Sequence, residues 1–142
     1  MKFWDSSAVI TLCVVEPTSG ATRSLLRADP AMVAWWATRT ECLSGLMRRS
    51  REGALTGRGL GEARAALTAL AHSWVEVQAS ESVRIAAERL LAAHALPAAD
   101  ALQLSAAFIW CAGQTQGAEV VSFDSRLREA ALREGFGILP LL

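Results

Sequence analysis

Short apolar runs alternate along the chain with longer stretches in which apolar residues recur every three or four positions. The runs are rich in Val, Phe and Trp, which favour buried β-strands. We predict strands in these runs, at Phe3–Trp4, Met32–Trp36, Val75–Val77, Val120–Phe123 and Phe136–Leu139. The longer stretches have the period of helices that bury one face. We predict helices at residues 6–15, 18–28, 38–51, 62–73, 81–95, 97–111 and 125–134.

The order of these elements indicates the fold class. Short apolar strands that alternate with helices are typical of a parallel sheet covered by helices on both faces. We therefore predict an α/β protein, a three-layer α/β/α sandwich around a short, mainly parallel central sheet. The chain length of 142 residues fits a single domain, residues 1–142. The glycines between residues 53 and 61 predict a flexible connection between two helices.

Bulk composition restricts the class of protein. Hydrophobic residues make up 52% of the chain, which excludes a disordered chain, and a formal net charge of zero gives no general attraction for nucleic acid. Arginines cluster between residues 39 and 64, where they form either a local basic surface or an ordinary solvated helix face. Asp5 interrupts the first apolar segment, and no run is long enough to span a bilayer. We therefore predict a cytoplasmic protein without membrane contact.

Sulfur and imidazole ligands are scarce in the sequence. The cysteines are Cys13, Cys42 and Cys111, and no two of them are spaced as a Cys-x-x-Cys pair. The only histidines, His72 and His94, have no ligand-like spacing to the cysteines. We predict free thiols in a reducing compartment and no zinc site.

Acidic residues recur where strands give way to helices. Asp5 follows the first predicted strand, Glu41 lies in the first turn of the helix after the second, and Asp124 follows the fourth. Asp100 lies in the first turn of the helix that Pro97 opens. The carboxyl ends of parallel strands share one edge of the sheet, and ligands bind at that edge. We therefore expect these carboxylates to gather there.

Each acid also has an ordinary structural explanation. An aspartate at a helix N-cap accepts backbone N–H groups, and acids in a first turn complement the helix dipole. Thr38 and Glu41 match a capping box, and Asp124 could simply cap the helix that follows it. Taken singly, each acid fits a structural role better than a catalytic one, whereas the set of four favours a shared site.

Four carboxylates in one pocket need a counter-charge. Two carboxylates about 5 Å apart repel each other by about 3 kcal/mol at an effective dielectric constant near 20. Divalent cations remove this repulsion, and ligands that are all oxygens suit Mg²⁺ or Mn²⁺ rather than Zn²⁺. Such sites activate a water molecule and hold a phosphate during hydrolysis. The acids therefore predict metal-dependent phosphoryl chemistry, without identifying the substrate.

Four segments, in chain order, carry a family resemblance. They are Asp5–Val9, Glu41 in its helix, Ala99–Ala106 and Val121–Leu127, and together they extend over nearly the whole chain. This ordered set resembles the PIN-domain family, and more closely its VapC-type toxins from prokaryotic toxin–antitoxin pairs. The resemblance implies a Mg²⁺- or Mn²⁺-dependent endoribonuclease that hydrolyses RNA and is held inactive by a cognate antitoxin protein. The resemblance and the apolar composition together also suggest a homodimer.

The resemblance assigns roles to individual residues. It implies that the four acids form the family's acidic quartet, with Asp5 and Asp100 as the firmest metal ligands. Ser7 matches a small hydroxyl residue of the family, which implies that it orients the Asp5 carboxylate by a hydrogen bond. Ser122 stands where the family often has threonine. Thr11 is a departure, since many relatives carry a lysine there, and it puts substrate or partner contacts at that position in doubt.

Two other protein classes are alternatives to the ribonuclease. A non-catalytic PIN-like module would only pair with a protein partner, and the presence of all four acids argues against it. An aspartate-phosphorylating protein, either a haloacid-dehalogenase-type phosphatase or a receiver domain, would use a lysine late in the chain. Lys2 is the only lysine, and Ser7 stands where the dehalogenase pattern needs a second aspartate. The sequence therefore favours the ribonuclease.

Overall fold

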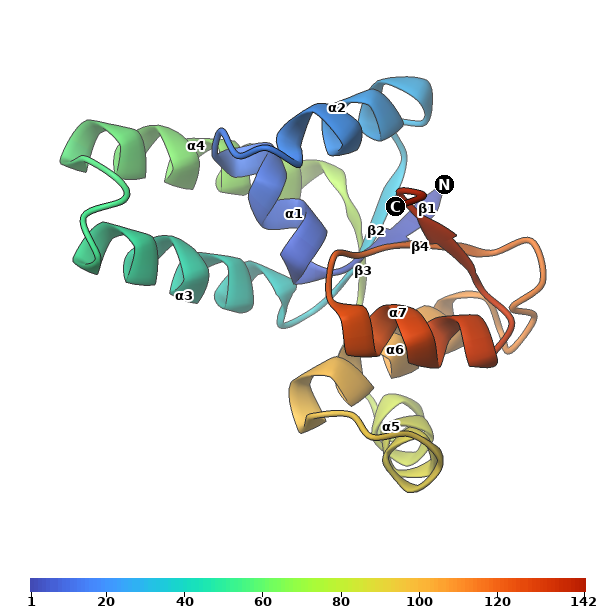
Figure 1. Cartoon of the computed structure of the whole chain (residues 1–142). Coiled ribbons are helices and arrows are strands. Elements are labelled where there is room, and N and C mark those ends of the chain that lie inside the picture. Colours follow the sequence, from blue (N-terminus) through green and yellow to red (C-terminus); the bar gives the residue numbers. More distant parts are fainter.

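A five-stranded parallel sheet forms the centre of the protein (Figure 1). The structure is a computed structural model that describes all 142 residues. The strands are β1 (Lys2–Trp4), β2 (Met32–Trp35), β3 (Val75–Val77), β4 (Glu119–Val121) and β5 (Gly137–Leu139), in the spatial order β3-β2-β1-β4-β5. In the register, Phe3 lies between Val33 and Val120. The predicted fold class is confirmed, and every predicted strand is present.

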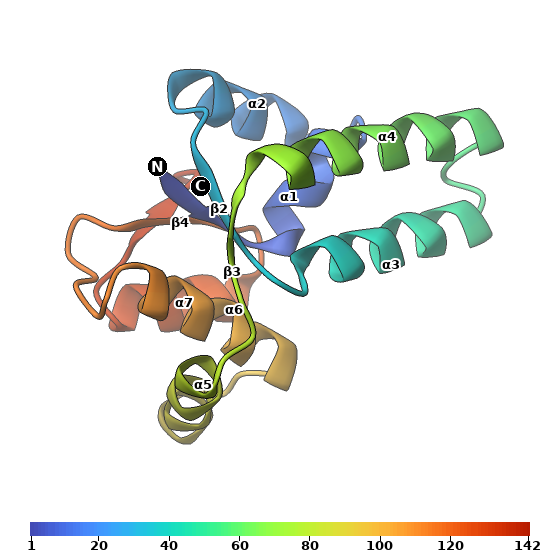
Figure 2. The same ribbon diagram turned by 180° about the vertical axis from the view of Figure 1, so that it is seen from behind.

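Helices cover both faces of this sheet (Figures 1 and 2). One layer contains α1 (Ser6–Cys13), α2 (Ser19–Ala28), α3 (Thr38–Arg51) and α4 (Gly57–Ser73). The other layer contains α5 (Glu81–Ala93), α6 (Ala98–Trp110) and α7 (Ser125–Arg133). No helix combines the length and the apolar character needed to cross a bilayer. The three cysteines are unpaired, as the sequence predicts.

Alternate strand residues build two separate cores, one under each helical layer. Phe3 and Val120 belong to the core beneath α5, α6 and α7. Trp4 and Val121, the next residues along the same strands, belong to the core beneath α1, α3 and α4. All four side chains are fully buried. Because successive side chains of a strand point to opposite faces, both must be apolar, which explains the short unbroken apolar runs in the sequence.

Helix α4 begins five residues before its predicted start, at Gly57 instead of residue 62. Gly57, Gly59 and Gly61 are therefore helical, and the prediction of a flexible connection there is wrong. Thr56 is the N-cap, and its side chain accepts a hydrogen bond from the Gly59 N–H at 3.0 Å. Farther along the helix, Leu67 is buried in the core that α1 and α3 share. This cap and the packing outweigh a helix penalty of about 1 kcal/mol per glycine.

The strand order places a crevice between β1 and β4. From β1 the chain extends through β2 to β3 on one side, and α5 and α6 then carry it back to β4 on the other side of β1. In open parallel sheets, ligands bind where the strand order reverses in this way, at the carboxyl ends of the strands. Asp5 directly follows β1, and Asp124 lies soon after β4. Both acids therefore lie beside the crevice.

Candidate active site

Asp5 is fixed at the carboxyl end of β1 by its neighbours in the sequence. Trp4 before it and Val9 in α1 are both fully buried. The backbone N–H of Asp5 donates to the carbonyl oxygen of Val121 at 3.0 Å, which continues the pairing with β4. Asp5 is also the N-cap of α1, because its side chain accepts a hydrogen bond from the Ser7 N–H. These restraints hold a carboxylate that is only 3% exposed at the edge of the sheet.

Two serine hydroxyls orient the Asp5 carboxylate. Ser7 Oγ donates to Asp5 Oδ2 at 2.5 Å, and Ser122 Oγ donates to the same oxygen at 2.9 Å. The predicted hydrogen bond between Ser7 and Asp5 is therefore present. Ser7 Oγ also accepts the Phe123 N–H at 2.9 Å, and Ser122 Oγ accepts the Asp124 N–H at 3.1 Å. One hydrogen-bond network thus joins the chain after β1 to the chain after β4.

Glu41 reaches the pocket from the first turn of α3 and is held by an amide. Gln103 Nε2 donates to Glu41 Oε2 at 2.8 Å and to Thr38 Oγ1 at 3.1 Å. The predicted capping box is wrong, because the N-cap is Ala37 and the Thr38 hydroxyl bonds to Gln103 instead. Gln103 is fully buried, and the sequence did not predict it as a residue of the site. Its only signal is its place one turn after Asp100 on the same helix.

Asp100 and Asp124 begin two helices of the other layer. Asp124 is the N-cap of α7, and its Oδ1 accepts the Leu127 N–H at 2.8 Å. Its predicted capping role is therefore confirmed. Asp100 lies in the first turn of α6 and takes part in no side-chain hydrogen bond or ion pair. Its carboxylate is free to bind a ligand.

One pocket of about 520 Å³ is lined by all four predicted acids, which are Asp5, Glu41, Asp100 and Asp124. As the side chains stand, no three His, Cys, Asp or Glu residues are grouped closely enough to hold a metal ion. The carboxylates thus surround the pocket without meeting at one point. Side-chain rotation is needed to bring three or more of them onto one ion.

The pocket holds an excess of negative charge. Five acids line it: Glu16 pairs with Arg49 at 2.7 Å, whereas Asp5, Glu41, Asp100 and Asp124 take part in no ion pair. Burial, followed by the charges of Asp124, Asp5 and Glu41, raises the pKa of Asp100 to about 6. Burial also raises the pKa of Asp5, although the two serine hydroxyls act in the opposite direction, and it raises the pKa of Glu41. The ionised pocket therefore favours a bound cation.

The donor set fits a hard divalent cation such as Mg²⁺ or Mn²⁺. Carboxylate oxygens are the ligands that these ions prefer, and no histidine lines the pocket. Cys42 does line it, but burial raises the pKa of its thiol, so the thiol stays protonated and is a poor ligand. Asp5 and Asp100 would hold the ion, with Glu41 and Asp124 completing the set. A bound ion would supply an activated water and neutralise charge on a phosphate.

The raised pKa of Asp100 predicts that the metal-free protein is less stable at neutral pH than near pH 5. Between pH 3.8 and about 6, the folded protein binds more protons at this site than the unfolded chain does. The free energy of unfolding therefore falls as the pH rises through this window, and it stays lower above it. Since the side chain is partly open to water, we expect a contribution of about 1 kcal/mol, or about 3 °C in Tm.

Thermal unfolding in EDTA at both pH values measures this effect. Other acids titrate in the same range, so the quantity of interest is the difference in Tm between the wild type and Asp100→Asn. We expect the variant to be the more stable of the two at neutral pH, with a smaller difference near pH 5. A difference that does not change with pH would contradict the assigned shift.

Thr11, which stands where the resemblance implies a lysine, has a structural role in this chain. Thr11 is buried, and its hydroxyl bonds to the Thr22 hydroxyl at 2.8 Å, which joins α1 to α2. It adds no positive charge to the pocket. Arg49 lines the pocket in an ion pair with Glu16 at 2.7 Å. The other two cations near the site are Arg48, which also lines the pocket, and Arg126 in α7, which lowers the pKa of Asp100. Neither arginine has an ion-pair partner.

Comparisons with known proteins agree with this geometry. Residues 2–132 match the sequence profile of the PIN domain. The chain is similar to VapC20 from Mycobacterium tuberculosis, a toxin described as cleaving the sarcin–ricin loop, at 16% identity and a TM-score of 0.66, over 92% of this chain and 95% of that one. It is also similar to a toxin–antitoxin complex from Klebsiella pneumoniae, at 17% identity and a TM-score of 0.60, over 89% and 88% of the two chains.

A third similar structure is FitAcB from Neisseria gonorrhoeae, at 14% identity and a TM-score of 0.67, over 99% of this chain and 97% of that one. A search of curated protein sequences finds no match. At these identities the three structures show a shared fold, whereas the profile match extends over most of the sequence. The chain therefore belongs to the PIN domain family.

Proposed function

We propose that this protein is a Mg²⁺- or Mn²⁺-dependent endoribonuclease and the toxin of a toxin–antitoxin pair. Asp5, Glu41, Asp100 and Asp124 would be its metal-binding and catalytic residues. The observation that carries the proposal is that these acids line one pocket from the starts of four separate helices. None of them has a basic partner, and a divalent cation would offset their mutual repulsion.

Each part of the pocket has a role in this proposal. Asp5, oriented by two serine hydroxyls, and Asp100, free of other bonds, would be the main ligands. Gln103 would keep Glu41 directed into the pocket through its amide hydrogen bond. Arg48 is exposed on the pocket wall and would bind an RNA phosphate close to the ion. The chain's own side chains thus supply both the ligands and a contact for the substrate backbone.

The substrate class and the partner are proposed by analogy with relatives. VapC20 is described as a toxin that cleaves the sarcin–ricin loop, and the Klebsiella structure is described as a toxin–antitoxin complex. We extend to this chain the coarser features only: RNA as the substrate, a cognate antitoxin protein as the inhibitor, and a homodimer as the assembled form.

A non-catalytic PIN-like module that only pairs with a protein partner is the second candidate. The observation in its favour is that no three acids are grouped as a ready ion site. Metal-dependent stabilisation discriminates between the two candidates. We expect Mg²⁺ or Mn²⁺ to raise the Tm of the wild type and not that of the variant Asp5→Ala, Asp100→Ala. Equal responses of the two proteins would favour the binding module.

The purified protein is expected to cleave RNA when Mg²⁺ or Mn²⁺ is present and to lose this activity in EDTA, because the carboxylates alone repel a phosphate. The measurement is gel electrophoresis of RNA fragments, with activity restored when an excess of Mn²⁺ is added back. Cleavage that continues unchanged in EDTA would overturn the metal-dependent mechanism.

Growth assays test the toxin role separately from the chemistry. Expression of the protein alone is expected to slow bacterial growth, and co-expression of the neighbouring open reading frame is expected to relieve the effect. The variant Asp100→Asn, expressed to the same level, serves as the control and is expected to leave growth normal. Normal growth with the wild type would contradict the toxin role while leaving the nuclease chemistry to be judged by RNA cleavage.

A further inference from the structure

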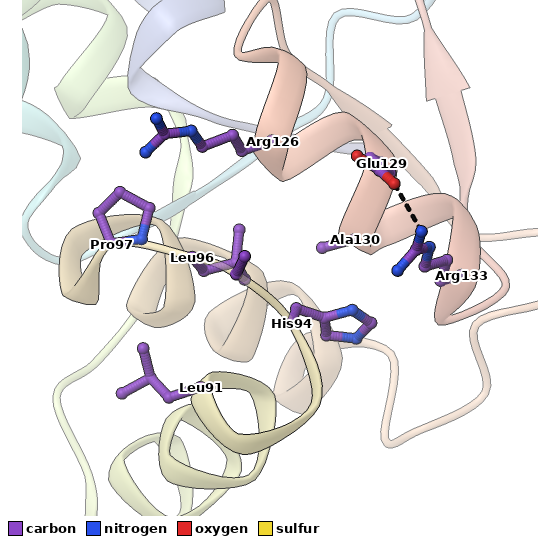
Figure 3. Close-up of a pocket in the computed structure, with 9 residues that line it drawn as sticks. Leu91, His94, Leu96, Pro97, Arg126, Glu129, Ala130 and Arg133 are labelled. Carbon is purple, nitrogen blue, oxygen red and sulfur yellow. Dashed lines mark hydrogen bonds and ion pairs between the residues drawn. The ribbon is translucent and has the colours of Figure 1, made fainter.

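A second and larger pocket lies beside the acidic pocket. Its volume is about 710 Å³, against about 520 Å³ for the acidic pocket. Its walls are the connection between α5 and α6 on one side and α7 on the other (Figure 3). We call it the Arg126 pocket, after the only one of its charged side chains that has no ion-pair partner. This volume lies in the range of small-molecule binding sites.

The two pockets are lined by neighbouring residues at the starts of the same two helices, α6 and α7. Pro97 lines the Arg126 pocket, and Asp100, one turn later on α6, lines the acidic pocket. Likewise, Asp124 at the start of α7 lines the acidic pocket, and Arg126, two residues later, lines the Arg126 pocket. Arg126 is also close enough to Asp100 to lower its pKa. A linear ligand whose reacting group lies in the acidic pocket can therefore continue directly into the Arg126 pocket.

The chemistry of the Arg126 pocket combines one free cation with an apolar wall. Arg133 is paired with Glu129 at 2.6 Å, and His94 Nε2 lies 2.7 Å from Glu134 Oε1. Arg126 is exposed and extends past Pro97, at the other end of the pocket from Arg133 (Figure 3). Its guanidinium is thus the group available to an anion, and it stands at the boundary with the acidic pocket.

The apolar wall lies opposite α7. It consists of Leu91 at the end of α5 and Leu96 and Pro97 in the connection to α6. Leu91 is 43% exposed, and Leu96 is half-buried against the core. Single-stranded RNA offers a matching arrangement, since it repeats an anionic phosphate beside a flat, largely apolar base that can leave the stack.

We propose that the Arg126 pocket is the subsite for the nucleotide next to the scissile phosphate, an inference that rests on the proposed ribonuclease function. Arg126 binds the next phosphate along the strand, on the far side of this nucleotide from the cleaved bond. The base lies against Leu91, Leu96 and Pro97. The pocket thereby determines which nucleotide is accepted next to the cleaved bond, and Arg126 is a substrate-binding residue.

The salt dependence of RNA binding tests the phosphate contact. Binding of a fluorophore-labelled single-stranded RNA is followed by anisotropy in the Asp100→Asn background, at a fixed low Mg²⁺ concentration, so that the RNA stays intact. We expect Arg126→Gln to weaken binding by about tenfold and to reduce the slope of log K against log[salt] by about 0.7, the value for one phosphate contact on a single strand. Arg126→Lys is expected to keep most of the slope.

A matched arginine on the surface serves as the control. Arg84 is exposed on α5, pairs with Glu81 and does not line either pocket. Arg84→Gln removes the same charge and is expected to leave the slope unchanged. The proposal would be overturned if Arg126→Gln had the same salt slope as the Asp100→Asn parent. It would also be overturned if Arg126→Gln and Arg84→Gln lost equal amounts of RNA affinity.

The apolar wall is tested with a second pair of variants. Leu91→Asp places a negative charge against the base, whereas Ile85→Asp makes the same change at an exposed residue of α5 outside the pocket. In the otherwise wild-type protein, we expect Leu91→Asp to raise the KM for RNA cleavage by about tenfold and to change the preferred nucleotide beside the cut. Ile85→Asp is expected to do neither.

Three results would count against the subsite, and they are distinguishable. If the wild type cleaves no RNA with Mg²⁺ or Mn²⁺, the proposed function fails and the subsite fails with it. If the wild type cleaves RNA and the Arg126 and Leu91 variants match their controls, only the subsite fails. If Leu91→Asp converts a dimer into a monomer while Arg126→Gln leaves the salt slope unchanged, the pocket belongs to an interface with a second copy of the chain.

Discussion

Replacing Asp100 with asparagine is expected to lower the rate of metal-dependent RNA cleavage by about a thousandfold, equivalent to about 4 kcal/mol of transition-state stabilisation. The reason is that Asp100 makes no other bond and is therefore free to act as a ligand. The substitution keeps the size of the side chain and removes only its charge. Single-turnover cleavage of a labelled RNA, in Mg²⁺ and in Mn²⁺, measures the loss.

The same variant is not expected to unfold the protein. Removing one of the unpaired negative charges from the acidic pocket relieves repulsion, so the Tm of the variant in EDTA should equal or exceed that of the wild type. Glu88→Gln is the matched control, because Glu88 is exposed on α5 and lines no pocket around the site. It is expected to keep full activity. A stable Asp100→Asn protein with undiminished cleavage would rule out the assigned site.

Replacing Ser7 with alanine is expected to impair both the fold and the chemistry. The Ser7 hydroxyl donates to Asp5 and accepts the Phe123 N–H, so its loss leaves one backbone donor unpaired and a buried carboxylate with one partner fewer. These two losses together amount to about 3 kcal/mol, or about 10 °C in Tm. The pKa of Asp5 should also rise further, because that hydroxyl lowers it.

A higher pKa for Asp5 predicts a specific defect in cleavage. The protonated acid is a poor ligand, so the Ser7→Ala enzyme should need more Mg²⁺ for half-maximal cleavage and should gain activity as the pH is raised. Ser44→Ala is the control, since Ser44 is exposed on α3 and distant from this network. A Ser7→Ala protein with wild-type Tm and Mg²⁺ dependence would show that the hydroxyl does not orient Asp5.

Local sequence rules predict the sheet well because they act on short segments. The three central strands β1, β2 and β4 put side chains into both cores, as Phe3 and Trp4 show, so an unbroken apolar run is the direct signature of this burial. The acids after β1 and β4 are also predictable. Asp5 and Asp124 each follow a strand and cap the next helix. In a parallel sheet the carboxyl ends of the strands lie at one edge, so these two caps lie at the same edge.

Tertiary partners explain the features that the sequence did not reveal. The glycines at the start of α4 argue against a helix on propensity alone, and the Thr56 cap and the packing of Leu67 override them. Thr38 has the pattern of a capping residue, but its hydroxyl is hydrogen-bonded to Gln103, 65 residues later in the sequence. The Arg126 pocket depends on how α7 packs against the connection between α5 and α6, and no local pattern encodes that arrangement.

Crystals grown or soaked with Mn²⁺ give the most direct measurement of the central claim, which is that carboxylates from four helices share a divalent ion. Anomalous scattering locates Mn²⁺ without reference to activity. The claim predicts an anomalous peak within coordination distance of Asp5 and Asp100 in the wild type, and no peak there in Asp100→Asn. A fully loaded crystal with that pocket empty of Mn²⁺, or with the ion held only by other residues, would contradict it.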